Sequence, residues 1–198
     1  MDAPTSDLDA RIAERVRALR TERGLSLEAL AGRSGVSRSM ISLIERGETS
    51  PTVVVLEKLA AGLGVTLAAL FEAPATDGGP PSGPLARRED QPTWRDPGSG
   101  YVRRNVTPPG AGQPMRIVEV QLPAGAHVAF ENPGHETPVH QQVWVLDGEI
   151  EVTIGTERHR LRKGDCLAMQ LDGPSMLHNP THKTARYAVV SASEPRSR

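Results

Sequence analysis

A change of composition near residue 72 constrains the fold of this chain more than any other feature of its sequence. Residues 1–71 are rich in Ala, Leu, Arg and Glu and contain two prolines, whereas Pro, Gly and valine-rich runs recur from Ala73 onward. Helix formers before this point and β-formers with turn residues after it favour two domains of different class. We expect an all-α N-terminal domain over residues 1–72, a Pro- and Gly-rich linker over residues 73–100, and an all-β C-terminal domain over residues 101–198.

Charge, cysteine content and hydropathy exclude several classes of protein. The 198 residues carry a formal net charge of −1, so any affinity for nucleic acid must come from the local placement of basic side chains. The single cysteine, Cys166, excludes an intramolecular disulfide and a multi-cysteine zinc site. No run approaches the roughly 18 apolar residues that span a bilayer, and the first ten residues are acidic and polar. The sequence therefore predicts a cytoplasmic protein with no membrane partner.

Helical periodicity and capping residues predict a five-helix bundle. The first helix begins near Leu8 and ends at Gly24, with apolar residues at helical spacing. Ser26 is expected to cap a second helix that ends at Ala31 or Gly32, and Ser37 a third over residues 38–46. Met40, Ile41 and Ile44 are expected to supply the buried face of the third helix. A fourth helix is predicted after Thr52, and Leu67, Leu70 and Phe71 close the bundle.

The second and third predicted helices are short, and Gly35 allows a left-handed turn between them. In this geometry one helix crosses the phosphate backbone while the next enters the major groove. Small hydroxyls at the start of the third helix allow close approach, and Arg38 is able to hold a guanine through two hydrogen bonds. The predicted DNA-binding residues are Leu27, Ser37, Arg38, Ser39, Ser42 and Arg46.

Three runs in register, over residues 25–31, 35–42 and 44–52, resemble the phage-repressor-like (XRE-type) helix-turn-helix family, and the resemblance extends over about residues 8–71. It implies a transcriptional regulator that binds an operator in double-stranded DNA. It also implies an ion pair between Arg20 and Glu45 that links the first helix to the recognition helix, the alternative being two separately solvated charges. A bundle that binds protein instead of DNA, or an antitoxin-like regulator, are the other interpretations of this domain.

Short runs of β-formers separated by turn residues predict an antiparallel sandwich or barrel in the C-terminal domain. Turn residues at hairpin spacing are Asp147-Gly148, Gly155-Thr156 and Gly164-Asp165. The expected strands cover residues 101–106, 115–122, 127–130, 142–146, 150–154, 158–162, 167–170 and 185–191.

The runs over residues 142–152 and 161–165 resemble the cupin family, and the resemblance extends over about residues 101–192. It implies a cupin-like antiparallel β-barrel. In cupins that bind metal, a first motif supplies two histidines and a glutamate, and a second motif supplies another histidine. Here the glutamate position falls on Gln141 and the second-motif histidine position on Ser175. The two remaining positions fall on His135 and Thr137, or, at the other allowed spacing, on Gly134 and Glu136.

An amide, a hydroxyl and one imidazole make a poor site for a transition metal, so we expect no metal, no cofactor and no enzyme activity. His140 and His178 each stand one residue from a motif position, and a one-residue shift in a strand turns a side chain to the opposite face. What remains is a barrel with an effector pocket formed by His135, Thr137, Gln141 and Ser175, or a filled barrel that serves only for dimerisation.

The predicted function is sequence-specific DNA binding by a transcriptional regulator, in the first instance a repressor. Because one short recognition helix reads few bases, a homodimer on a two-fold operator is expected. The cupin-like barrel is expected to bind a small-molecule effector, to hold the dimer together, or both. The rival from another class is a cupin metalloenzyme fused to a DNA-binding domain.

Overall fold

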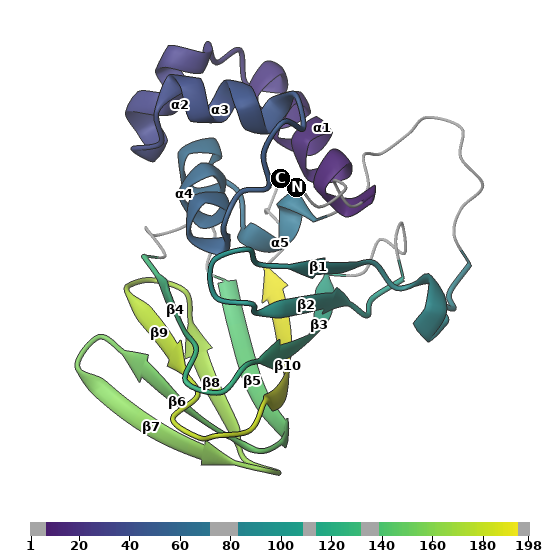
Figure 1. Ribbon diagram of the computed structural model, residues 1–198, viewed down its shortest axis with the longest axis vertical. Helices are drawn as coiled ribbons and strands as arrows, with labels where there is room; N and C mark the ends of the chain where they lie inside the picture. Colours follow the sequence, from purple (N-terminus) through teal and green to yellow (C-terminus); the bar gives the residue numbers. More distant parts are fainter. Residues whose placement is uncertain (1–6, 72–82, 109–113, 132–138, 194–198) are drawn as a thin grey trace. The chain divides into compact units, whose positions relative to one another are not determined.

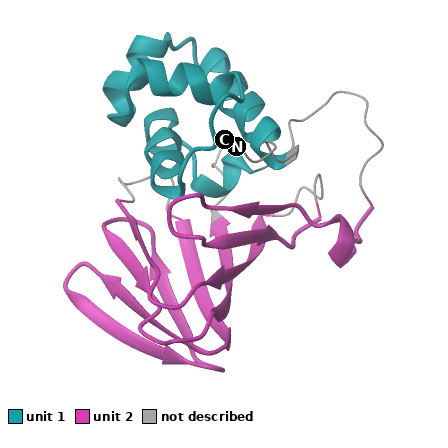
Figure 2. Ribbon diagram, in the orientation of Figure 1, with its two compact units in different colours: residues 1–80 teal, residues 81–198 magenta. Residues whose placement is uncertain are grey.

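The chain consists of two compact units, residues 1–80 and residues 81–198 (Figure 2). The computed structural model describes residues 7–71, 83–108, 114–131 and 139–193. Within these ranges the first unit is helical, and the second is built of strands with one short 3-10 helix, η1 (Arg88–Asp90). None of the helices described is both long enough and apolar enough to cross a membrane.

The described residues 7–71 of the first unit form five helices, as the sequence predicts (Figure 1): α1 (Asp7–Glu22), α2 (Leu27–Ser34), α3 (Arg38–Glu45), α4 (Val53–Leu63) and α5 (Leu67–Leu70). Four of them start after a Ser or Thr whose hydroxyl accepts a hydrogen bond from the N–H three residues on. These caps are Ser26, Ser37, Thr52 and Thr66. Each cap satisfies a backbone donor that the first helical turn leaves without a partner, and so defines where its helix begins.

The second helix is longer than expected and runs to Ser34, beyond Ala31 and Gly32. Gly35, with φ of 67°, ends it, and its N–H donates to the carbonyl of Ala31. Gly32 lies within the helix because only Gly35 takes the left-handed conformation that stops it. The core of this unit is aliphatic and includes Ile12, Val16, Leu30, Ile41, Ile44, Leu56, Leu59 and Leu63.

A close approach of α2 and α4 depends on a glycine. A Cβ added to Gly62 of α4 would lie 2.8 Å from the Cβ and 3.0 Å from the backbone N of Ser34. Ser34 is buried, and its hydroxyl donates to the carbonyl of Leu30 at 2.7 Å, so it has little freedom to move. The absence of a side chain at Gly62 therefore lets the two helices pack directly.

Gly62→Ala is expected to destabilise the helical unit by about 1 to 3 kcal/mol, because the new methyl overlaps Ser34. Gly32→Ala is the matched control, since Gly32 lies in a helix with open space around its Cβ position. The control should stabilise the unit by roughly 0.5 kcal/mol or more through helix propensity. Urea unfolding followed by circular dichroism measures both. Two variants that shift stability in the same direction would contradict this packing.

The strands of the second unit form two antiparallel sheets (Figure 1). The six-stranded sheet has the order β1-β2-β3-β10-β5-β8, and the four-stranded sheet the order β4-β9-β6-β7. Their bounds are β1 (Thr93–Arg95), β2 (Val102–Asn105), β3 (Met115–Leu122), β4 (His127–Phe130), β5 (Val139–Asp147), β6 (Glu149–Ile154), β7 (Glu157–Arg162), β8 (Cys166–Gln170), β9 (Ser175–His178) and β10 (Ala185–Ser193).

Buried side chains alternate along these strands, so each sheet has an inner and an outer face. The inner face of the six-stranded sheet includes Val118, Val120, Leu122, Val143 and Val145, and that of the four-stranded sheet Val128, Ile150, Val152 and Leu177. The prediction of an antiparallel, strand-rich C-terminal unit is confirmed. Among the described strands, hydrogen-bonded pairing stays within each sheet, so a closed barrel is not observed and remains a prediction.

Two of the three expected hairpins are not hairpins. Gly155-Thr156 joins β6 to its neighbour β7, as predicted. In contrast, Gly148 lies between β5 and β6, and Gly164 between β7 and β8, which belong to different sheets. Both glycines have positive φ, 79° and 95°, and let the chain turn sharply from one sheet into the other.

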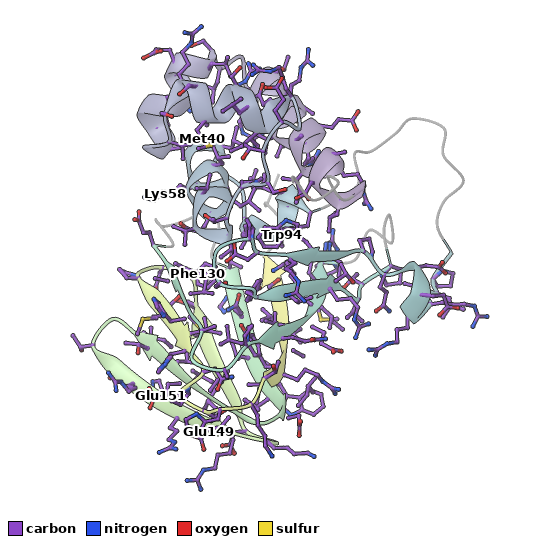
Figure 3. All side chains as sticks on the ribbon, viewed as in Figure 1. Met40, Lys58, Trp94, Phe130, Glu149 and Glu151 are labelled. Atoms are coloured by element: carbon purple, nitrogen blue, oxygen red, sulfur yellow. The ribbon has the colours of Figure 1, made fainter. Side chains whose placement is uncertain are left out.

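The predicted boundary of the second domain is too late, because β1 lies inside the expected linker of residues 73–100. β1 pairs with β2, placing Trp94 opposite Arg103. Trp94, labelled in Figure 3, is buried in the second unit. The carboxylate of Asp96 accepts a hydrogen bond from the N–H of Ser99 in the turn that follows. Strand β9 was also missed. Residues 72–82 of the expected linker lie outside the described residues.

Candidate nucleic-acid interface and cupin site

The start of α3 is exposed and polar, while its other side anchors the helix in the core. Ile41 and Ile44 are fully buried, whereas Ser37, Arg38 and Ser39 are exposed. Ser37 caps the helix by accepting a hydrogen bond from the N–H of Met40 at 3.2 Å. A buried aliphatic anchor behind an exposed first turn gives a rigid helix that presents short side chains to a partner.

Met40 does not belong to the buried face, contrary to expectation. Its side chain is 38% exposed, on the first turn of α3 (Figure 3). Met40 stands four residues before Ile44 and so lies near the face that Ile41 and Ile44 share, but the core leaves it partly uncovered in the first turn of α3. Sequence periodicity placed it with the core because it is apolar. In the structure it extends the exposed surface formed by Arg38 and Ser39.

The predicted contact Arg46 is already engaged in an ion pair. Its guanidinium donates to Glu48 through Nε at 2.6 Å and Nη2 at 2.8 Å, and its Nη1 donates to the hydroxyl of Ser42. Both charged side chains are half exposed, and the hydrogen bonds from Arg46 lower the pKa of Glu48. Glu48 therefore places a negative charge beside two of the predicted DNA contacts, which sequence analysis did not anticipate.

Glu48→Gln is expected to tighten binding to random-sequence duplex and to steepen its salt dependence. The variant removes a negative charge that repels DNA phosphates, and it frees the guanidinium of Arg46 to contact one of them. One more neutralised phosphate makes the slope of log K against log salt concentration more negative by roughly 0.9. Fluorescence anisotropy across a salt series measures the slope. The matched control is Glu14→Gln, an exposed carboxylate on α1. Equal changes in the two variants would mean that net charge alone is responsible.

Arg20 and Glu45 lie together between α1 and the end of α3. Arg20 donates to Glu45 from Nε at 2.6 Å and from Nη2 at 2.7 Å, and from Nη1 to the carbonyl of Leu25 at 2.9 Å. The two side chains are 16% and 7% exposed, so the pair is largely removed from water. One guanidinium thus joins α1, the loop before α2 and the end of α3. The remaining predicted contact, Leu27, is half-buried in the first turn of α2.

The predicted effector residues are only partly within the described structure. Ser175 is buried, and the amide of Gln141 donates to the sulfur of Met169, a buried residue, at 3.9 Å. Both therefore occupy inward-facing positions on their strands. His135 and Thr137, like Gly134 and Glu136, lie outside the described residues.

His140 and His178 point away from the inner faces of the sheets. His140 is an exposed residue between two inward-facing ones on β5, and the Nδ1 of His178 lies 3.4 Å from a carboxylate oxygen of Glu151 on the outer side of the four-stranded sheet. No group of three or more potential metal-ligating side chains occurs within the described ranges. Gln141 and Ser175, at two of the cupin ligand positions, do not fit a transition metal.

Asn179, which matches the second cupin motif, has a structural role. It is fully buried, and its amide nitrogen lies 2.8 to 3.0 Å from the carbonyls of Leu122, Pro123 and Lys183. Its carbonyl accepts hydrogen bonds from the N–H and hydroxyl of Thr181. The motif position therefore fixes the loops after β3 and β9.

Comparison with known proteins identifies both units. Residues 16–70 match the helix-turn-helix family, and residues 118–191 match the cupin domain family. The chain is 28% identical over 173 residues to the HTH-type transcriptional regulator SutR of Escherichia coli (strain K12), which covers 87% of this chain and 89% of that protein. It is 39% identical over 67 residues to the control protein C.MunI of a Mycoplasma species, covering 33% of this chain and 90% of that protein.

The chain is also similar to the crystal structure of an HTH_3 family transcriptional regulator from Vibrio cholerae. The alignment covers 96% of this chain and 98% of that chain, with a TM-score of 0.72 and 29% identity. A helix-turn-helix bundle followed by a strand-rich cupin unit defines a two-domain DNA-binding protein. The chain belongs to the XRE-type helix-turn-helix family of transcriptional regulators and carries a cupin domain.

Proposed function

We propose that this protein is a repressor that reads a specific duplex operator with the first turn of α3 and acts as a homodimer. The observation that carries the proposal is the surface of that turn, where Arg38, Ser39 and Met40 are exposed above a buried Ile41. A guanidinium is suited to guanine, hydroxyls to several bases and an apolar side chain to the thymine methyl group. Arg38 and Ser39 are exposed and Met40 is 38% exposed, so this surface is open to a partner.

Arg38→Ala is expected to weaken operator binding by about 1 to 3 kcal/mol and to abolish discrimination at one base pair, because a bidentate contact to guanine is lost. The operator is first selected from a random duplex library with the full chain. Anisotropy titrations then compare operator, operator variants and random DNA. Arg33→Ala, which removes an exposed charge from the last turn of α2, is the control. Equal weakening on operator and random DNA would identify Arg38 as a phosphate contact instead.

The cupin unit supplies pairing and a site for a small effector in this proposal. Two recognition helices in successive major grooves require a pseudo-palindromic operator with half-sites about 10 base pairs apart or a multiple of that distance. Gln141 and Ser175 face inward and, together with His135 and Thr137, form the proposed polar contacts to the effector. The relatives are named as transcriptional regulators, which favours regulation over catalysis. Mass spectrometry of natively purified protein tests for a bound effector.

A further inference from the structure

The end of α3 carries a short network of hydrogen bonds between the side chains of Ser42, Arg46 and Glu48. The Nη1 of Arg46 donates to the hydroxyl oxygen of Ser42, while its Nε and Nη2 donate to the two carboxylate oxygens of Glu48 at 2.6 and 2.8 Å. A carboxylate that accepts two hydrogen bonds from one planar guanidinium holds that group in a fixed orientation. Glu48 therefore determines where the remaining donor of Arg46 points, which is at Ser42.

The backbone places Glu48 for this contact. Gly47 takes the left-handed conformation, with φ of 69°, and its N–H donates to the carbonyl of Ile44 at 2.9 Å. The N–H of Glu48 donates to the carbonyl of Leu43 at 3.0 Å. These two bonds form a Schellman motif, which turns the chain back over the last turn of the helix. The position of Glu48 beside Arg46 is thus fixed by the way α3 ends.

The hydroxyl of Ser42 differs in its bonding from other helical hydroxyls of this unit. Those of Thr21 and Ser34 donate to the backbone carbonyl four residues earlier, at 2.8 and 2.7 Å. The oxygen of Ser42 instead accepts a hydrogen bond from Arg46, and in the described residues 7–71 its hydrogen has no acceptor. Ser42 is half-buried, so this hydrogen is available to a partner outside the chain.

The bond from Arg46 changes what the Ser42 hydroxyl can recognise. A serine in the major groove ordinarily reads any base, because it donates to an acceptor or accepts from an amino group. The acceptors there are purine N7, guanine O6 and thymine O4, and the amino groups are those of adenine and cytosine. A hydroxyl that accepts from a cation becomes a better donor, because hydrogen bonds in a chain polarise one another. Ser42 is therefore biased towards an acceptor.

We propose that Glu48 is a positioning residue for operator recognition, which acts through Arg46 to make Ser42 a hydrogen-bond donor to one acceptor on a base. Ser42 stands four residues after Arg38, so both side chains lie on the same face of α3. The inference rests on the proposed function, in which this helix reads the duplex. It accounts for a carboxylate beside a DNA-binding surface: Glu48 lowers the affinity for phosphates in general and sharpens the distinction between bases.

Ser39 provides a comparison within the same helix. Its hydroxyl lies 3.2 Å from that of Ser37, and either oxygen can be the donor. Because both partners are neutral hydroxyls, the pair can reverse its direction and suit an acceptor or an amino group. Base discrimination that depends on Ser39 should therefore be independent of Glu48, whereas discrimination that depends on Ser42 should require it.

The test measures base discrimination by the full chain on the operator selected as described above. Anisotropy titrations against operators changed at each base pair in turn compare the native chain, Ser42→Ala, Glu48→Ala and the double variant. Ser42→Ala should reduce discrimination at one base pair by about 3- to 10-fold, the range of a single neutral hydrogen bond. Glu48→Ala should reduce it at the same pair, and the double variant should lose no more than Ser42→Ala does.

Two further variants separate this role from charge and from folding. Glu14→Ala, which removes an exposed carboxylate from α1, is the matched control and should leave discrimination unchanged at every pair. Arg46→Met keeps most of the side chain but removes the donor, so it should act at the same base pair as Glu48→Ala. Circular dichroism confirms that each variant is folded.

Base analogues that lack one groove atom at that pair then identify the partner of Ser42. Deleting an acceptor should weaken binding by the native chain about 3- to 10-fold and leave binding by Ser42→Ala unchanged. A contact to an amino group would overturn the proposal, and so would Glu48→Ala binding that changes by the same factor on every sequence. If Arg38→Ala abolishes discrimination at its base pair while Glu48→Ala alters none, the proposed function stands and only this inference fails.

Discussion

Replacing Glu45 with alanine should destabilise the helical unit by about 3 kcal/mol, because it leaves the largely buried guanidinium of Arg20 without its carboxylate partner. Arg20 is 16% exposed and would keep only its hydrogen bond to the carbonyl of Leu25 among those described above. The loss should appear as a lower urea midpoint with an unchanged slope, which indicates a change in stability without a change in the surface exposed on unfolding.

The chain contains a matched control for this experiment in the pair of Arg46 and Glu48. It has similar hydrogen-bond geometry, but both side chains are half exposed, so Glu48→Ala should change stability by less than about 1 kcal/mol. Replacing Arg20 and Glu45 together with methionine should restore most of the stability, because no unpaired charge remains. If Glu45→Ala and Glu48→Ala lose the same stability, burial does not distinguish the two ion pairs. The pair of Arg20 and Glu45 then contributes no more to the stability of the unit than an exposed pair does.

Trp94→Ala should have the largest effect in the second unit, about 3 to 5 kcal/mol, because it leaves a cavity where an indole is fully buried. Unfolding in urea is followed by the fluorescence of Trp144, the other tryptophan of the chain. Thr93→Ala, at an exposed position of the same strand, is the control and should cost less than about 1 kcal/mol.

This variant also decides where the second domain begins. If Trp94→Ala were no more harmful than Thr93→Ala, β1 would contribute nothing to the core, and residues 73–100 would behave as the linker that composition predicts. A large loss would place the start of the domain before β1, as the pairing of β1 with β2 indicates.

The helical unit was predictable because its signals are local. Ser26, Ser37 and Thr52 act on N–H groups three residues away, and Gly35 ends α2 through its own backbone conformation. The first and third helices end one or two residues before the predicted Gly24 and Arg46, at Glu22 and Glu45. The larger error, Ala31 or Gly32 for the end of α2, arose because two glycines were available and only their backbone conformations distinguish them.

The sheets were less predictable because strand pairing is not local. Asp147-Gly148 and Gly155-Thr156 look alike as turns, yet only the second joins strands that pair, since pairing depends on residues far along the chain. Strand β1 has only three residues, and the prolines and glycines around it led to its assignment to the linker. Its partner, β2, lies within the predicted first strand.

The candidate site shows the same limit. The motif positions of Gln141 and Ser175 could be assigned from sequence, and both side chains lie on inner faces. The engagement of Arg46 by Glu48 and the exposure of Met40 depend on side-chain conformation and on which surfaces the core covers, and neither has a sequence signal. They alter the predicted DNA-binding surface more than any change in the fold does.

The separation of α3 into buried anchoring residues and exposed residues has an evolutionary consequence. Ile41, Ile44 and Glu45 hold the helix in place, whereas Arg38, Ser39 and Met40 contribute little to the core. With the operator read by the second group, as proposed above, mutations there should change which genes the protein controls at little cost to the stability of the fold, because exposed positions tolerate substitution. Ser37 is the exception, since its hydroxyl caps the helix and lies 3.2 Å from that of Ser39. Drift in operator preference among descendants of this chain should accordingly be frequent at residues 38–40 and restricted to other capping residues at position 37.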